Sequence, residues 1–168
     1  AGVVTDCTQP GPGPGTLLSA LKDGGLVAFA CSGTIPIPEQ IGINYDTVLD
    51  ATGYHVELQG DGDNRLFDVG IPDSQGTVKF EIRHLVLTNG NGGDSGGGAI
   101  TNYGDTTIIQ SAVLSNTARY GGAIDHRKGT LLIVNSILAG NSATGIDDGG
   151  GGAIDQFNND NAQNIIVH

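Results

Sequence analysis

A serine in a glycine-rich segment is the first residue that could do chemistry. Gly93-Asp94-Ser95-Gly96-Gly97 spells the nucleophile motif of trypsin-like serine proteases. In those enzymes a histidine, held by a buried aspartate, activates the serine, and backbone amides stabilise the oxyanion. The histidines upstream, His55 and His84, do not lie in an Ala-Ala-His-Cys context, and 168 residues are few for two barrels. We therefore interpret the segment as a turn and expect no catalytic residue.

Three groups of acidic and amide side chains could bind calcium, whose protein ligands are oxygen atoms. They are Asp61 with Asp63, Asp160 among Asn158, Asn159 and Asn161, and the set Asp147, Asp148 and Asp155. None has the EF-hand spacing or the nonapeptide repeat of calcium β-rolls. The last set is the best candidate, because a cation would hold two adjacent carboxylates of a glycine-rich loop close together. The alternative is solvated turns, and no cofactor other than calcium is indicated.

The basic residues and histidines give a weaker signal. The densest basic set is Arg119, Arg127 and Lys128, with Arg83 upstream. Asp125-His126-Arg127-Lys128 follows a Gly-Gly-Ala-Ile string, so we consider it a candidate contact for a sugar acid, with a solvated turn as the alternative. The histidines at positions 55, 84, 126 and 168 are scattered without metal-site spacing, and we expect them at the surface.

The charge balance excludes several kinds of partner. Seven Lys and Arg against 18 Asp and Glu give a net charge of −11. Nucleic acids and anionic membrane surfaces require clustered cations, so neither is expected as a partner. No apolar run approaches the ~20 residues that span a bilayer. A hydrophobic content of 38% with many Val, Ile and Leu argues against disorder.

Cys7 and Cys31 are the only cysteines, and no His/Cys cluster accompanies them. Two cysteines 24 residues apart in an acidic chain that begins at Ala1 favour a disulfide and a secreted location. The alternative is two buried free thiols in a cytosolic protein. The first residue fits either a mature form after signal-peptide cleavage or an excised fragment.

The string Gly-Gly-Ala-Ile occurs three times, beginning at Gly97, Gly121 and Gly151, with spacings of 24 and 30 residues. Each copy precedes a polar turn and a β-branched run, and the first two are followed by a second strand-like piece that leads into Asn116 or Asn141. A unit of this length cannot bury its apolar face alone, but stacked copies can, through parallel strands. The repeat therefore predicts an all-β parallel β-helix, or solenoid, over an antiparallel sandwich.

The N-terminal part fits the same architecture. Thr16–Asp23 is the one convincing helical stretch, with Thr16 as N-cap and a glycine pair as its stop, and such a helix can cap the first coil. Candidate strands are 26–31, 34–37, 43–49, 54–58 and 66–69. We expect a single domain over 1–168, with an arm and capping helix in 1–25 and about six or seven coils in 26–168.

Specific residues also carry a family resemblance: Val4-Thr-Asp-Cys7, the helix from Leu17, Val27-Ala-Phe-Ala-Cys31 with Gly33-Thr-Ile35, and the Gly-Gly-Ala-Ile copies with their Asn turns. With them the chain resembles bacterial secreted and surface right-handed parallel β-helix proteins, including those related to chlamydial polymorphic outer membrane proteins. The resemblance covers nearly the whole chain, and it is specific for fold and weak for activity. It implies a right-handed helix, a Cys7–Cys31 pair across the first coil and a structural or adhesive role. The insertion near Asp147 departs from the pattern.

We therefore expect a non-enzymatic, secreted or cell-surface structural or adhesive module. The alternative is a polysaccharide-binding or polysaccharide-cleaving β-helix, which should show acids and Arg or Lys converging in a groove on one lateral face. A calcium-stabilised module is a third reading. The run Asn164-Ile165-Ile166-Val167 looks like a strand of a further coil. We expect its edge to be covered by a longer parent chain or by another copy, head to tail, which would give a filament.

Overall fold

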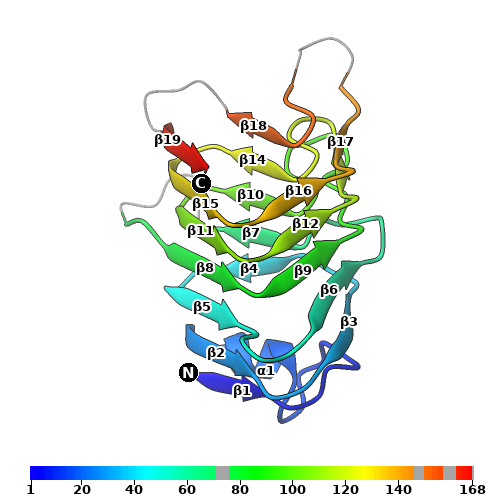
Figure 1. Cartoon of the computed structure of the whole chain (residues 1–168), viewed down its shortest axis with the longest axis vertical. Helices are drawn as coiled ribbons and strands as arrows, with labels where there is room; N and C mark the ends of the chain where they lie inside the picture. Colours follow the sequence, from blue (N-terminus) through cyan, green and yellow to red (C-terminus); the bar gives the residue numbers. More distant parts are fainter. Residues whose placement is uncertain (71–75, 146–149, 157–161, 168) are drawn as a thin grey trace.

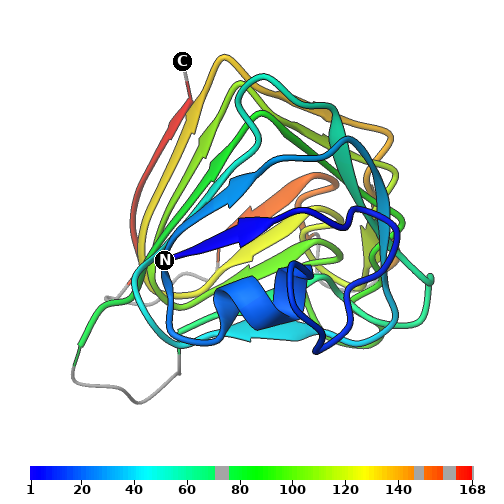
Figure 2. The ribbon, with the colours of Figure 1, turned by 90° about the horizontal axis from the view of Figure 1, so that it is seen from below.

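The computed structural model describes residues 1–70, 76–145, 150–156 and 162–167. Its strands stack into a right-handed parallel β-helix of about six turns, with one short helix at the N-terminal end (Figure 1). All strand pairings among the described residues are parallel, which confirms the predicted solenoid and rules out the antiparallel sandwich. Seen along its axis, the coil has a roughly triangular outline with one sheet on each side (Figure 2).

Three sheets run the length of the stack. The first, sheet A, contains β1 (Gly2–Val4), β2 (Gly25–Phe29), β5 (Thr47–Asp50), β8 (Lys79–Arg83), β11 (Asp105–Ile109), β15 (Gly129–Val134) and β19 (Ala162–Val167). Sheet B contains β3 (Gly33–Ile37), β6 (Val56–Gly60), β9 (Leu85–Thr88), β12 (Ala112–Leu114) and β16 (Ile137–Ala139). Sheet C contains β4 (Ile41–Ile43), β7 (Phe67–Val69), β10 (Ile100–Asn102), β14 (Ile124–His126) and β18 (Ile154–Gln156). A two-stranded sheet pairs β13 (Thr117–Ala118) with β17 (Ser142–Ala143).

The core consists of columns of aliphatic side chains, one from each coil. Successive side chains of a strand point to opposite faces, so alternate residues enter the interior. In sheet A the parallel register aligns five buried residues, Val27, Leu49, Ile82, Ile108 and Ile133. Sheet B contributes a matching column, Ile35, Leu58, Leu87 and Val113. Like side chains thus pack on like, and each coil buries the apolar surface of the next.

The corners between sheets are set by residues with a positive φ angle. Between sheets A and B this residue is His84, Gln110 or Asn135, with φ of 56°, 46° and 48°. After sheet B it is Asn89, Ser115 or Gly140, with φ of 55°, 54° and 65°. One left-handed residue at each of these corners turns the chain sharply while the flanking strands stay in register.

Asparagine side chains stitch the second corner together. Asn116, fully buried, accepts a hydrogen bond at Oδ1 from the Gly90 amide (2.8 Å) and donates from Nδ2 to Asn141 Oδ1 (3.0 Å). Asn141 in turn donates from Nδ2 to the Val113 carbonyl (2.8 Å). The predicted Asn turns are therefore a ladder that satisfies buried backbone groups across three coils.

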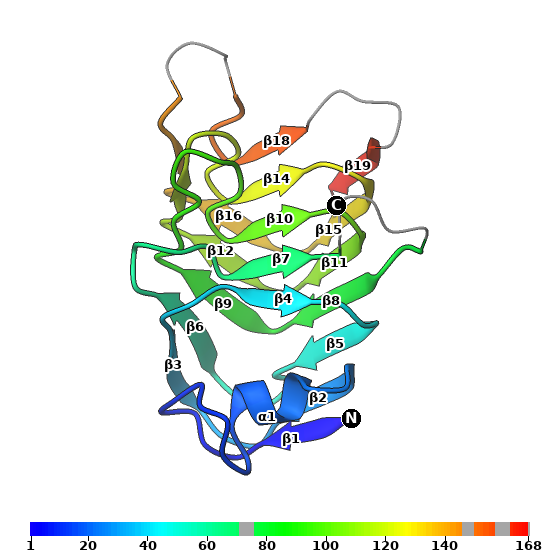
Figure 3. The same cartoon turned by 180° about the vertical axis from the view of Figure 1, so that it is seen from behind.

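The N-terminal end is covered by helix α1 (Leu17–Leu21), which lies below β4 at the end of sheet C (Figure 3). Thr16 holds the N-cap position, but its hydroxyl donates to the Gly11 and Gly13 carbonyls, each at 2.6 Å, instead of capping the helix. The predicted Cys7–Cys31 disulfide is confirmed, with Cα atoms 5.8 Å apart. Within the described ranges no helix is long and apolar enough to span a membrane.

One predicted strand is divided. The expected strand over 43–49 is the end of β4 and the start of β5, and a corner at Asn44–Asp46 separates them. Ile41 and Ile43 both face the core with Gly42 between them, which is the alternation of a strand. The expected strand over 43–49 wrongly assigned Ile43 to the following element.

Candidate functional site

The outer face of sheet C carries a column of polar side chains. The middle residues of its five strands align in register, in the order Gly42, Asp68, Thr101, Asp125 and Asp155. Neighbouring strands lie ~4.8 Å apart, so Asp125 and Asp155 are adjacent along the solenoid axis. Acids and arginines converge on this face, which tests the expectation of an enzyme-like groove. A second group of this kind, Arg83 with Asp50 and Glu81, lies on the outer face of sheet A.

Arg65 and Arg127 neutralise most of this column. Arg65 forms an ion pair with Asp68 (3.1 Å) and donates hydrogen bonds to Thr101 Oγ1 and Ser95 Oγ. Arg127 pairs with Asp125, with its Nε and one terminal nitrogen both 2.6 Å from Oδ2. A hollow of about 410 Å³ remains beside Arg65, between Gln40, Ser95 and Tyr103.

Asp125 is enclosed by the glycine-rich segment that resembles a protease motif. Only 1% of its side chain is exposed, and a Cβ built on Gly96 would lie 2.0 Å from Asp125 Oδ2. Gly96 therefore covers this carboxylate as a roof, and any larger residue at this position would clash with it. The Ser95 hydroxyl donates to the Gly92 carbonyl (2.7 Å) in a turn. The interpretation of 93–97 as a turn agrees with this geometry.

Burial raises the pKa of Asp125, and the charge of Asp155 raises it further, while the hydrogen bond and charge of Arg127 oppose the shift. Oδ2 is held by Arg127, whereas Oδ1 is buried without a hydrogen-bond partner among the described residues. A carboxylate in this position is costly to ionise, which accounts for the direction of the shift. Its enclosure also keeps it from contact with a large substrate.

The proposed sugar contact at Asp125-His126-Arg127-Lys128 does not form one exposed surface. Asp125 faces outward beneath the roof, and His126 faces the core, and both residues are fully buried. His126 Nδ1 lies 3.0 Å from Asn102 Nδ2, in a corner where Asn102 Oδ1 also accepts from the Thr106 hydroxyl (2.8 Å). The expected surface position is therefore wrong for His126, because alternation along β14 turns residue 126 inward.

The calcium candidates are divided between described and undescribed residues. Asp147, Asp148, Asp160, Asn158, Asn159 and Asn161 lie outside the described residues, as does His168. Asp155 stands in the sheet C column, and its Oδ1 accepts from the Gly151 amide (3.3 Å). Asp61 Oδ1 accepts from the amides of Asp63 (2.9 Å) and Asn64 (3.2 Å), which is a local turn. Within the part of the chain that is described, no group of three or more His, Cys, Asp or Glu side chains is placed to hold a metal ion.

The predicted assembly residues Asn164, Ile165, Ile166 and Val167 belong to β19, which pairs in parallel with β15 as the last strand of sheet A. Val167 is 64% exposed.

The corner between sheets A and B presents a different arrangement, which the sequence analysis missed. A trough follows this corner over several coils as two adjoining hollows of about 670 and 490 Å³, which share His55, His84 and Val86. We call it the corner trough. Five of its polar side chains come one from each coil, and they are Ser32, His55, His84, Gln110 and Asn135.

The backbone aligns these five residues. Ser32, His55 and His84 directly precede residues that pair in register at the start of β3, β6 and β9. The amide of His55 donates to Ser32 Oγ (3.1 Å), and the amides of His84 and Gln110 donate to carbonyls of the following coil (3.2 and 3.0 Å). The side chains therefore form a ladder parallel to the solenoid axis, with one rung for each coil.

Tyr54 and Ile137 project along the same trough. Five residues, 51–55, join β5 to β6, whereas His84 alone joins β8 to β9, so the longer loop stands out as a wall. Tyr54 on this loop is 41% exposed, and Ile137 at the far end is 61% exposed. Both residues line the same hollow, so they add apolar surface beside its polar side chains.

Carboxylates flank the trough. Glu57 lines one hollow and accepts hydrogen bonds from Thr88 Oγ1 (2.5 Å) and Thr34 Oγ1 (3.3 Å). Burial alone would raise the pKa of Asp50, but hydrogen bonds from Thr52 and the charges of Arg83 and His84 outweigh it and leave that pKa below its usual value. Asp50 also forms an ion pair with Arg83 (3.6 Å), the residue that directly precedes His84.

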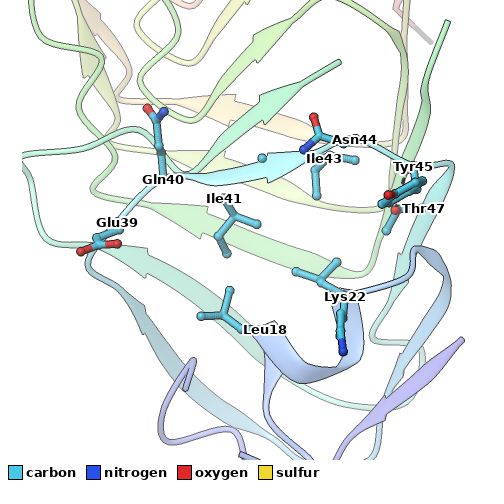
Figure 4. A pocket seen from close by; sticks show the side chains of 11 residues that line it. Leu18, Lys22, Glu39, Gln40, Ile41, Ile43, Asn44, Tyr45 and Thr47 are labelled. Atoms are coloured by element: carbon cyan, nitrogen blue, oxygen red, sulfur yellow. Dashed lines mark hydrogen bonds between the residues drawn. The ribbon is translucent and has the colours of Figure 1, made fainter. Parts of the chain in front are cut away.

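A further hollow of about 330 Å³ lies between α1 and β4 (Figure 4). Leu18, Ile41 and Ile43 face it, and Glu39 and Lys22 stand on opposite sides in that view. Its polar lining residues do not repeat from coil to coil, unlike those of the corner trough; they are Lys22, Glu39, Gln40, Asn44, Tyr45 and Thr47.

The sequence contains a signal for the corner trough, but this signal cannot be recognised from local patterns alone. Gln110-Ser111 and Asn135-Ser136 occur 25 residues apart and in the same place relative to the following strand. Such pairs can be recognised as a surface only when the register between coils is known.

No protein family model, curated protein or solved structure matches this chain.

Proposed function

We propose that this chain is a non-enzymatic, extracellular adhesive module that binds a macromolecular ligand through a lateral face of the solenoid. The observation that carries the proposal is the contrast between two faces. The acids and arginines of sheet C bind one another, and Asp125 is covered, whereas the polar groups of the corner trough are exposed and repeat along the axis. Contact spread over several coils suits adhesion to an extended partner.

Two further features support this assignment. The Cys7–Cys31 disulfide is typical of an oxidising, extracellular compartment. Asp125, the acid of the sheet C column whose pKa is raised, also lacks the access that general acid–base catalysis needs, since a catalytic group must reach within hydrogen-bond distance of its substrate. The resemblance to secreted and surface β-helix proteins points to the same role.

Retention on coated surfaces tests the proposal. Labelled protein is passed over cellulose, mannan, pectate and mucin, and the eluates are assayed for new reducing ends and unsaturated sugars. We expect retention on at least one surface without product formation. Retention on none of them, or products that increase in proportion to the protein, would contradict an adhesive module.

A further inference from the structure

We propose that the corner trough binds a neutral polysaccharide chain that lies along the solenoid axis. This inference rests on the proposed adhesive function and names its ligand and its site. The ladder of Ser32, His55, His84, Gln110 and Asn135 supplies the hydrogen-bonding groups, and Tyr54 supplies the aromatic surface.

The spacing of the ladder favours a sugar chain over a peptide. Its rungs repeat with the coils, at ~4.8 Å, whereas an extended peptide advances by ~3.4 Å per residue. A peptide lying along the trough would therefore fall out of step with the side chains after two or three residues. One hexose of an extended β-linked polysaccharide advances by nearly one coil, so each sugar meets an equivalent rung.

The side chains have the chemistry that recognises sugar hydroxyls. Imidazole, carboxamide and hydroxyl groups both donate and accept hydrogen bonds, as hydroxyls do. Of the five rungs, His84 is half-buried and the other four are exposed, so these groups are accessible. The 41% exposed ring of Tyr54 and the partly exposed Val86 offer apolar surface for the C–H faces of a sugar ring.

The negative charge of the protein favours a neutral polysaccharide over an acidic one. Glu57 is the carboxylate that lines the trough. The whole chain carries −11. A polyuronate would meet repulsion at both levels, since like charges disfavour association. A neutral polysaccharide carries no charge, so its binding is not opposed by this repulsion.

The backbone of the corner allows a clean removal of single rungs. His84 and Gln110 have positive φ angles, which glycine adopts readily, so His84→Gly and Gln110→Gly remove the side chains while the turn is kept. Ser115→Gly is the matched control, because Ser115 has the same backbone conformation (φ 54°) at the other corner, after sheet B. Tyr54→Ala removes the exposed ring.

Isothermal titration with cellohexaose, mannohexaose, laminarihexaose and hexagalacturonate tests the inference. We expect the wild-type chain to bind at least one neutral hexasaccharide more tightly than hexagalacturonate. Each glycine variant should bind about three- to tenfold more weakly, as for one lost hydrogen bond, and Tyr54→Ala about tenfold more weakly. Ser115→Gly should bind like the wild type, and circular dichroism should be the same for all variants.

Three outcomes would overturn the inference: binding of no neutral hexasaccharide, preference for hexagalacturonate, or binding that the trough variants leave unchanged. The outcomes also separate the two proposals. A chain that is retained on a coated surface, and whose retention the trough variants do not alter, is adhesive through another face. A chain that is retained on no surface loses the adhesive function as well.

Discussion

At the scale of single residues, Asp125 combines a covered carboxylate with a raised pKa. Between its ordinary value of 3.8 and its higher folded value, the native state binds more protons than the unfolded state. The contribution of Asp125 to stability therefore falls as pH rises through this window. We expect Asp125→Asn, which does not titrate, to become more stable relative to the wild type as pH increases above ~4.

Urea denaturation of both proteins measures this difference, over a pH range from about 3.5, near the ordinary pKa of Asp, to about 7. Asp50→Asn is the control of opposite sign, since the pKa of Asp50 is lowered and its contribution is lost as pH falls. A stability difference for Asp125→Asn that shrinks with rising pH would refute the assignment.

Asn116 makes a second prediction. Replacing it with alanine leaves the buried Gly90 amide without its acceptor and breaks the bond to Asn141. We expect Asn116→Ala to lower the free energy of unfolding by about 1–3 kcal/mol, the cost of an unpaired buried group. Gln59→Ala, at an exposed position on β6, should change it by less than about 0.5 kcal/mol. Equal effects from the two variants would show that the ladder adds nothing.

At the scale of elements, the repeated glycine pair makes a graded prediction. A Cβ on Gly98 would lie 2.3 Å from the Gly122 carbonyl oxygen, and one on Gly122 would lie 2.5 Å from that of Gly152. Gly152, in the same place of the last copy, has nothing within 4 Å. We expect Gly98→Ala and Gly122→Ala to destabilise the chain strongly or prevent folding, and Gly152→Ala to be tolerated.

Thermal denaturation by circular dichroism measures the series. The expected destabilisation of Gly98→Ala and Gly122→Ala is steric, because the backbones of neighbouring coils meet at these corners and cannot move aside. If all three variants melt alike, the close stacking of the corners is not what the glycines provide.

The elements also show what the sequence could predict. The repeated string, the apolar alternation and the Asn turns indicated the coils, and Ile100, Ile124 and Ile154 do begin three of the five strands of sheet C. The burial of Asp125 could not be predicted, because its roof is Gly96, 29 positions upstream and in a different coil. The corner trough was missed for the same reason, since its side chains meet only through register between coils.

At the scale of the whole molecule, the disulfide ties the N-terminal arm to the first coil. It closes a segment of 24 positions, so its removal should cost about 3 kcal/mol by restoring the freedom of the unfolded chain. We expect Cys7→Ser with Cys31→Ser, or a reductant added to the wild type, to lower the melting temperature. The reductant should leave the double variant unaffected, and a fall there would point to another cause.

End-to-end assembly remains a prediction at this scale. β16, β18 and β19 are the last strands of their sheets at one end of the stack, and an edge strand offers backbone groups for pairing. We expect light scattering to show a mass that grows with protein concentration, and negative-stain images to show filaments. A constant monomer mass over the whole concentration range would reject the assembly.

The hydrogen bonds between coils run along the axis of the stack, and each coil contacts only its neighbours. A pull between the two termini therefore loads these boundaries in series, and they rupture one after another and not together. The Cys7–Cys31 bond protects the arm and the first turn from this unravelling. Under such a load the stack yields in steps and dissipates work at each one, while the turn closed by the disulfide stays intact.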